Sequence, residues 1–238
     1  MPIDQYFDKL EGVRTSDKIR FTSKSANDKG YIFLEGKSHG SYSYRDLLIS
    51  CEKSHFGLNW FNAHHALHRE NSFMLNIRQY VDFLSLLKIG RGFDGNGQRI
   101  DESILLKMAY DILEIKDPWQ GEWLDADFKV NPTDKSLIIN YDHRTFNNKL
   151  QPAHFILLED YLSDNKNPGI DLEQWIDTLT RHGLPPSNIK SGNLWYFAPI
   201  NNSVAVFFAN SGRAGLDCNR GATYRSPGLG VRRVKIKT

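Results

Sequence analysis

The chain has 238 residues, which is enough for one large domain or two small ones. Its apolar fraction of 40% supports a sizeable core, and its net charge of +2 argues against a protein that coats polyanions through bulk charge. Two cysteines exclude a disulfide scaffold and a cysteine-rich zinc module. We expect no membrane span and no signal peptide, because no apolar run approaches the roughly 18 residues of a span and the start is polar. Virion, cell surface and cytoplasm all stay compatible locations.

Helical patterns dominate the first half of the chain. Ser43 and Asp46 have the spacing of a capping box, and Leu47, Leu48 and Cys51 follow at helical spacing, so a helix is predicted here. Three further helical patterns cover Asn59–Glu70, Ile77–Lys88 and Asp101 to about Ile115. Short strands are predicted near Lys18–Phe21 and at Tyr31–Leu34.

After Pro118 the pattern changes to short strands joined by turns, interrupted by one short helix over Asp171–Arg181. The strands are predicted around Trp119, Trp123 and Phe128, and at Leu137–Tyr141, Phe155–Leu158, Leu194–Phe197, Val204–Ala209 and Gly230–Ile236. No repeat and no long linker divides the sequence. We therefore predict a single α+β domain over residues 1–238, with helices in the N-terminal half and short strands and loops in the C-terminal half.

Basic residues are concentrated at the C-terminal end. Residues 201–238 carry seven arginine or lysine side chains and one acid, whereas residues 1–200 are acidic overall. Such asymmetry can mark a surface for nucleic acid or another anion. The alternative is a final edge strand with a solvated basic face, because Arg233, Lys235 and Lys237 alternate with Val234 and Ile236.

Histidine and cysteine motifs each have a plain structural alternative. His64 and His68 are four residues apart and could share a metal ion on one helix face, but a packed histidine face explains them without a third ligand. Cys51 and His55 would share a helix face, yet a nucleophile also needs an orienting group. Cys51 is therefore predicted to be a buried structural cysteine.

Two loop motifs match known sites only in part. The segment that begins at Asp94 spaces its oxygen ligands like a calcium loop, but Arg99 stands where a sharp turn requires glycine and Leu105 where a bidentate glutamate belongs. The G-x-G-x-x-G match from Gly90 to Gly95 follows a helix instead of a strand, so no phosphate cradle is predicted.

Three carboxylates at Glu122, Asp125 and Asp127 could support acid–base catalysis. No partner residue is identifiable in the sequence, and a solvated strand-and-turn face is predicted instead. We therefore expect no catalytic residue, no metal and no cofactor.

Residues 203–230 have an unusual pattern, in which small residues alternate with residues of unrelated chemistry. In a strand, Val206, Phe208 and Asn210 would share one face, and Ala205 and Phe207 the other. Both faces carry apolar groups, so the period does not decide which face lies inside.

The segments Ser203-Val-Ala-x-Phe-x-Ala-x-Ser211, Ala214-x-Leu216-x-Cys218 and Leu229-Gly-Val-Arg232, with Ser226 between them, resemble the variable region of diversity-generating retroelement proteins, especially those of archaea and archaeal viruses. Earlier segments resemble the same family, namely Gly40-Ser-Tyr-Ser-Tyr44, Asp117-Pro-Trp119, Glu122-Trp-Leu-Asp-Ala126 and Pro168-Gly-Ile-Asp-Leu172. The resemblance covers roughly residues 30–238. It implies a C-type lectin fold in its formylglycine-generating-enzyme-like form, with Leu229–Arg232 in the closing strand.

In that family an error-prone reverse transcriptase randomises template adenines, so the resemblance implies variable ligand-binding positions on a fixed scaffold. The variable positions would be Val206, Phe208, Asn210, Gly212, Arg213, Gly215, Asn219, Arg220, Gly221, Thr223, Tyr224, Arg225 and Gly228. The scaffold positions would be Ala205, Phe207, Ala209, Ala214, Leu216 and Cys218. Asp217, Ala222 and Pro227 have no assignment.

The resemblance implies a protein without enzymatic activity that recognises a protein or cell-surface ligand through this variable surface. No nucleic-acid partner is expected, and the oligomeric state stays open. Two alternatives remain: a sulfatase-modifying-type oxidase with a copper-binding cysteine pair, and a nucleic-acid-binding protein that uses the basic tail.

Overall fold

The computed structural model describes residues 28–147, 149–178 and 180–238, so the strand predicted near Lys18–Phe21 lies outside the described residues. The strands are β1 (Tyr31–Leu34), β2 (Ser38–His39), β3 (Tyr42–Ser43), β4 (Leu47–Ser54), β5 (Gln120–Val130), β6 (Leu137–Phe146), β7 (Lys149–Leu157), β8 (Lys166–Ile170), β9 (Leu194–Phe197), β10 (Ser203–Ala209), β11 (Ala214–Gly221) and β12 (Leu229–Ile236). The helices are α2 (Trp60–Arg69), α3 (Ile77–Ile89), α4 (Glu102–Leu113) and α5 (Leu172–Asp177).

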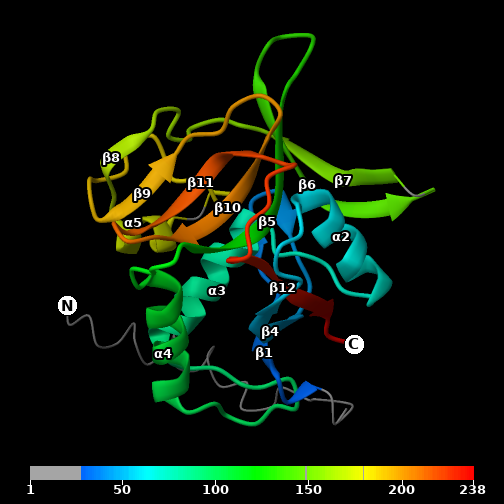
Figure 1. Cartoon of the computed structure of the whole chain (residues 1–238), viewed down its shortest axis with the longest axis vertical. Coiled ribbons are helices and arrows are strands. Elements are labelled where there is room, and N and C mark those ends of the chain that lie inside the picture. The colour runs from blue at the N-terminus through cyan, green and yellow to red at the C-terminus, as the bar shows by residue number, and fades with distance from the viewer. Residues whose placement is uncertain (1–27, 148, 179) are drawn as a thin grey trace, which may run out of the picture.

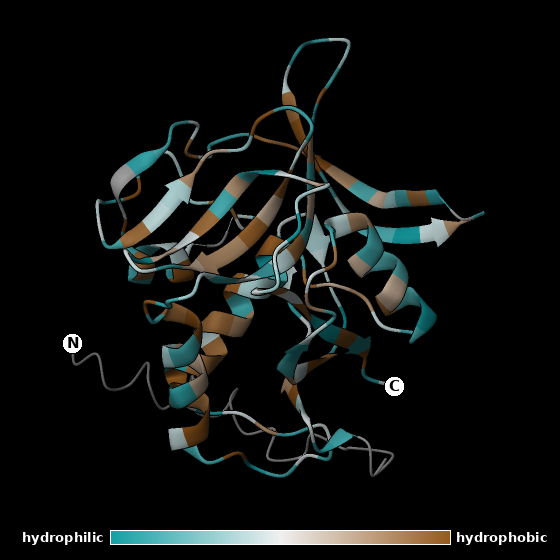
Figure 2. Ribbon diagram, in the orientation of Figure 1, coloured by the Kyte–Doolittle hydropathy of each residue, from teal (hydrophilic) through white to brown (hydrophobic). Residues whose placement is uncertain are grey.

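Within the described residues, ten strands form one mixed sheet in the order β1-β4-β12-β5-β10-β11-β9-β8, and β6 pairs with β5 and β7 (Figure 1). Neighbouring strands are antiparallel, except that β9 runs parallel to β11 and β5 runs parallel to β12. The β6–β7 hairpin extends away from the body of the molecule (Figure 1). Figure 2 shows that its outer part is largely hydrophilic, in keeping with the exposure of most of β7.

The predicted fold class is wrong. We expected an α+β domain of the C-type lectin kind with its helices first and its strands last, but strands hold about 40% of the described residues and helices about 20%. Strands are spread along the chain from β1 to β12, and α5 lies in the C-terminal half. The architecture is a large mixed sheet with helices packed against it, not a helical half followed by a strand half.

The segment after Ser43 is predicted as a helix, but it forms strand β4. This strand lies between β1 and β12, and its first four residues, Leu47 to Ser50, are all buried. A strand that is covered on both faces has a continuous apolar run instead of an alternating one, so its period does not distinguish it from a helix.

Helices α2, α3 and α4 confirm the predicted helical segments, and side-chain caps explain where they begin. The Asn59 side chain accepts a hydrogen bond from the Asn62 N–H at the start of α2. Asn76 and Gln79 form a reciprocal capping box on α3. Helix α5 ends at Asp177 and is therefore shorter than predicted.

Strand β10 is buried on both faces and separates two apolar clusters. Ala205, Phe207 and Ala209 face the larger cluster, which also contains core residues of α3, α4 and α5. Val206 and Phe208 face a second cluster, which contains the α2 residues Trp60, Ala63 and Leu67. Side chains therefore pack on both faces of β10, and α2 contributes to the cluster on one side while α3, α4 and α5 contribute to the cluster on the other.

The final strand is not an edge strand, contrary to the sequence-based alternative for the basic tail. Strand β12 lies between β4 and β5: Leu229 and Gly230 pair with β5, and the part from Val231 to Ile236 pairs with β4. Arg232 is buried, and its Nε lies 2.9 Å from Oε2 of buried Glu122. No described helix is long and apolar enough to cross a membrane.

Candidate ligand-binding face

The turn between β10 and β11 is shaped by its own first side chain. Oδ1 of Asn210 accepts hydrogen bonds from the backbone N–H groups of Gly212, at 2.8 Å, and Arg213, at 3.0 Å. The Asn210 N–H in turn donates to the Arg213 carbonyl at 3.1 Å. This asparagine therefore sets the backbone of the turn as well as lying at its surface.

A hollow of about 300 Å³ opens beside this turn, and we call it the aromatic hollow. Its lining residues are Trp119, Trp195, Phe197, Phe208, Asn210, Arg220 and Tyr224. They come from β9, β10, β11, the loop after β11 and the segment before β5. Phe208 lies within 6.1 Å of the Phe197 ring centroid and 6.5 Å of the Trp195 ring centroid, so these aromatic rings pack together at the hollow.

Arg220 supplies positive charge to the aromatic hollow and is held on two sides. Its Nη2 donates to Oδ2 of buried Asp217 at 2.6 Å, and its guanidinium lies 4.8 Å from the centre of the Tyr224 ring. The Tyr224 and Trp119 rings are also in a T-shaped arrangement, with their centroids 6.2 Å apart. Arg220 and Tyr224 are thus arranged as a pair before any ligand binds.

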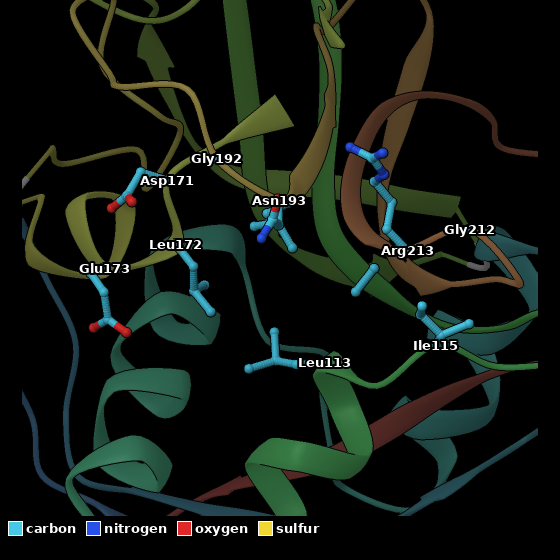
Figure 3. A pocket seen from close by; sticks show the side chains of 11 residues that line it. Leu113, Ile115, Asp171, Leu172, Glu173, Gly192, Asn193, Gly212 and Arg213 are labelled. Carbon is cyan, nitrogen blue, oxygen red and sulfur yellow. The ribbon is translucent and has the colours of Figure 1, made fainter. Parts of the chain in front are cut away.

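A larger hollow, of about 530 Å³, lies beside the β10–β11 turn and is lined by residues that include Gly212, Arg213, Leu113 and Leu172. Figure 3 shows Arg213 on one side of this hollow, and Asp171 and Glu173 on the other. The Arg213 guanidinium lies 4.9 Å from the Trp195 ring, which also lines the aromatic hollow. Arg213 and Trp195 therefore lie between the two hollows.

Most of the residues expected to vary lie at the surface of this region. The exposed positions are Gly212, Asn219, Gly221, Thr223, Tyr224 and Arg225, and the half-buried positions are Asn210, Arg213, Arg220 and Gly228. The residues expected to form the scaffold are all buried in the larger apolar cluster, and they are Ala205, Phe207, Ala209, Ala214, Leu216 and Cys218. The unassigned Asp217 is buried beneath Arg220.

Four expected variable positions do not offer a free side-chain site. Val206 is fully buried in the second apolar cluster, which also contains Trp123, the residue opposite it on β5. Phe208 is 3% exposed and reaches only the wall of the aromatic hollow. A Cβ atom at Gly215 would lie 2.6 Å from the Trp195 carbonyl oxygen, and one at Gly228 would lie 2.2 Å from the Trp119 carbonyl oxygen. Side chains at these two glycines would require the backbone to move.

Sequence reasoning missed Trp119, Trp195 and Phe197 as members of the hollow. The sequence places Trp119 in a predicted strand and in one motif of the resemblance, and it places Trp195 and Phe197 in a predicted strand, without assigning any of them to a site. The parallel pairing of β9 with β11 places Trp195 opposite Gly215, a long-range contact that no local pattern shows. The sequence indicates a role for Trp195 only through its place after the polar, glycine-containing segment Ser191-Gly192-Asn193.

The cysteines are separated by the sheet. Cys51 is on β4 and Cys218 on β11, four strand spacings apart, on the order of 19 Å along the sheet. Burial raises the pKa of the Cys51 thiol and raises that of Cys218 well above its usual value. No cysteine belongs to a cluster of potential metal ligands within the described residues. Cys51 is half-buried on a strand, so its predicted helix face with His55 is wrong.

The three carboxylates predicted to lie on a solvated face are instead largely inside. Glu122 accepts a hydrogen bond from the Tyr80 hydroxyl at 2.7 Å and faces Arg232. Asp127 accepts one from the Asn140 amide at 2.6 Å. Asp125 is 1% exposed and contacts two histidines. Each carboxylate is paired because an ionised group cannot be buried alone at acceptable cost.

Asp125 lies between His143 and His64. Its Oδ1 is 2.5 Å from His143 Nδ1 and 3.5 Å from His64 Nε2. Burial opposes ionisation of Asp125, but the two imidazoles outweigh it and hold the carboxyl pKa below its usual value. Burial lowers the pKa of His64 to about 3, so this histidine is neutral at pH 7. In contrast, the pKa of His143 is raised: burial lowers it, but the negative charge of Asp125 has the larger effect in the opposite direction.

Comparison with protein-family models gave no match, and comparisons with curated proteins and with solved structures gave no significant match.

Proposed function

We propose that this chain is a non-enzymatic ligand-binding protein whose face around β10 and β11 is diversified by a retroelement. The observation that carries the proposal is that Arg220 and Tyr224, two residues of the set expected to vary, line the aromatic hollow, while Asn219, Thr223 and Arg225 of the same set are exposed. A hollow built from such residues changes its chemistry whenever they change.

The hollow suits recognition of a protein surface. Aromatic and arginine side chains dominate binding hot spots, where a single anchor contributes about 2 kcal/mol or more. Tyr224 and Trp119 offer rigid rings, and Arg220 offers a cation beside them. Because Asp217 already matches the charge of Arg220, the ligand proposed for this variant is a protein segment that presents an aromatic side chain to the rings of the hollow.

The separation of buried and exposed positions supports the diversified face. Randomised side chains are tolerated only where the backbone does not depend on them, and Asn219, Thr223 and Arg225 are exposed with no side-chain hydrogen bond or ion pair identified among the described residues. The loop that carries Thr223 and Arg225 is tied by backbone bonds, since the Ala222 carbonyl accepts from the Trp60 N–H at 3.1 Å.

Two alternatives lose support from the same geometry. The basic residues of the tail do not form one cationic stripe: Arg232 is buried on Glu122, and Arg220 is paired with Asp217. A copper-binding thiol pair requires neighbouring cysteines, whereas Cys51 and Cys218 lie on strands that are not neighbours.

The proposal is tested with two displayed libraries of the full chain. The first randomises Asn219, Thr223, Tyr224 and Arg225, and the second randomises the buried residues Ala205, Ala209, Leu216 and Cys218. We expect most clones of the first library to display at the wild-type level and to yield binders against a panel of purified proteins, whereas clones of the second fail to display. Equal loss of display in the two libraries would contradict a tolerant face.

The retroelement origin has its own test in the genome. The proposal requires a near-copy of the 3′ coding end beside a reverse transcriptase gene, differing from it only at adenines. Complete identity of the 3′ end across independent isolates, with no such copy, would remove this part of the proposal while leaving the binding face to the library experiment.

A further inference from the structure

Three potential metal ligands from three different elements meet inside the molecule. His64 of α2, Asp125 of β5 and His143 of β6 are all buried, and one ligand atom from each lies within 4.8 Å of the others. No local sequence motif indicates this cluster, because Asp125 and His143 are separated from His64 by more than sixty residues.

The His64 ring is unusual among the buried polar groups. It is 0% exposed, and neither ring nitrogen has a hydrogen-bond partner among the described residues. Its Nε2 lies 3.5 Å from Oδ1 of Asp125 without forming a hydrogen bond. A buried imidazole nitrogen without a partner costs on the order of 1–3 kcal/mol, so such an atom indicates a ligand.

The other two residues are held next to each other, and binding of an ion between them requires the 2.5 Å from Asp125 Oδ1 to His143 Nδ1 to widen to about 3.4 Å. The backbone N–H of His143 donates to Oδ2 of Asp125 at 3.0 Å, which fixes the carboxylate and turns Oδ1 toward the two imidazoles. The Trp60 ring packs against His64 at 4.3 Å and against His143 at 4.9 Å, so both imidazoles are held in place.

We propose that His64, Asp125 and His143 bind one divalent transition-metal ion of the zinc type. Two imidazoles and a carboxylate are a common ligand set for such ions. Ligand atoms around tetrahedral zinc lie about 3.4 Å apart, close to the separation of His64 Nε2 from Asp125 Oδ1. The ion replaces the proton shared by His143 and Asp125, and it gives His64 the partner it lacks.

The ion ties helix α2 to β5 and β6 and thereby supports the binding face. Trp60, which packs on both imidazoles, donates its backbone N–H to the Ala222 carbonyl in the loop after β11. This proposal stands on the cluster alone and does not depend on diversification of that loop.

The test uses the full chain and Zn²⁺ as the probe. After dialysis against buffered Zn²⁺, we expect about one equivalent of zinc in the wild type, and a Co²⁺-loaded sample with the absorption of a site that contains nitrogen ligands. A Zn²⁺ concentration a hundredfold above Kd raises the unfolding midpoint by about 5 °C or more. The variants His64→Gln and His143→Gln lose at least tenfold in affinity.

The matched control is His65→Gln, which changes the next residue of the same helix and leaves zinc binding unchanged. His65 is half-buried and contacts Thr145 instead of Asp125. Less than one tenth of an equivalent of zinc in the wild type, with no Zn²⁺-dependent shift of its midpoint, would overturn the proposal. So would equal loss of affinity in His65→Gln and His64→Gln. If the His64 and His143 variants fail to fold, the wild-type zinc content and Co²⁺ spectrum decide alone.

Discussion

The buried ion pair of Glu122 and Arg232 makes a sharp prediction about stability. Both side chains are 5% exposed; Arg232 also donates to the Cys51 carbonyl at 2.5 Å, and the Tyr80 hydroxyl donates to Glu122. The variant Arg232→Met leaves the Glu122 carboxylate buried without its cation. Removing one partner of a buried pair costs about 3–5 kcal/mol, because the remaining charge is uncompensated.

The assay is urea unfolding at pH 7, followed by tryptophan fluorescence, and the matched control is Arg225→Met at an exposed position. We expect a loss of about 3–5 kcal/mol for Arg232→Met and under about 0.5 kcal/mol for the control. The double variant Glu122→Gln with Arg232→Met should be more stable than Arg232→Met alone, since no charge then remains buried. A loss below about 1 kcal/mol for Arg232→Met would refute the reasoning.

Two further predictions concern a glycine and a histidine. Gly228→Ala should lower the unfolding free energy by about 1–3 kcal/mol, because its Cβ would lie 2.2 Å from the Trp119 carbonyl oxygen. Gly221→Ala, with open space around its Cβ, should change stability by under about 1 kcal/mol, and equal effects of the two substitutions in thermal unfolding would contradict this geometry. Burial lowers the pKa of His182 to about 4, below its unfolded value of about 6.5, so the unfolded chain binds more protons between these pH values. The unfolding free energy should therefore fall by up to about 3 kcal/mol as pH drops from 6.5 to 4. When the unfolding free energy of His182→Gln is measured over the same pH range, this part of the decrease should be absent. An identical decrease in the variant would show that His182 does not contribute.

Local patterns predicted helices well and strand placement less well. Helices α2 and α3 were predicted from helical spacing and from caps at Asn59 and Asn76, which depend only on neighbouring residues. Strand β4 was predicted as a helix because both of its faces are buried: Leu47 and Ile49 pack in the larger apolar cluster, and Leu48 packs with Tyr31 and Phe33 on the other face. Whether one face of a strand or both are covered depends on distant segments, and the apolar run of β4 does not show it.

The site shows the same division. The polar and small residues between Asn210 and Arg225 indicated a surface of mixed chemistry, and most of them do lie at the surface. The pattern could not tell that Val206 is buried in the second apolar cluster, or that Trp195 lies beside Gly215 through a parallel strand pair. The cluster of His64 with Asp125 and His143 was equally hidden, because its members meet only when α2 packs on the sheet.

The sequence by itself determined the features that depend on residues within about one turn or one strand: the helix starts, the several strand segments of the second half and the small residues of β10. The tertiary structure alone decided that both faces of β10 are buried, that β12 lies within the sheet, and that the charged groups Glu122 and Arg232 are buried together. The physical reason is that burial and pairing arise from packing between distant segments, and a local pattern constrains only which packings are compatible with it.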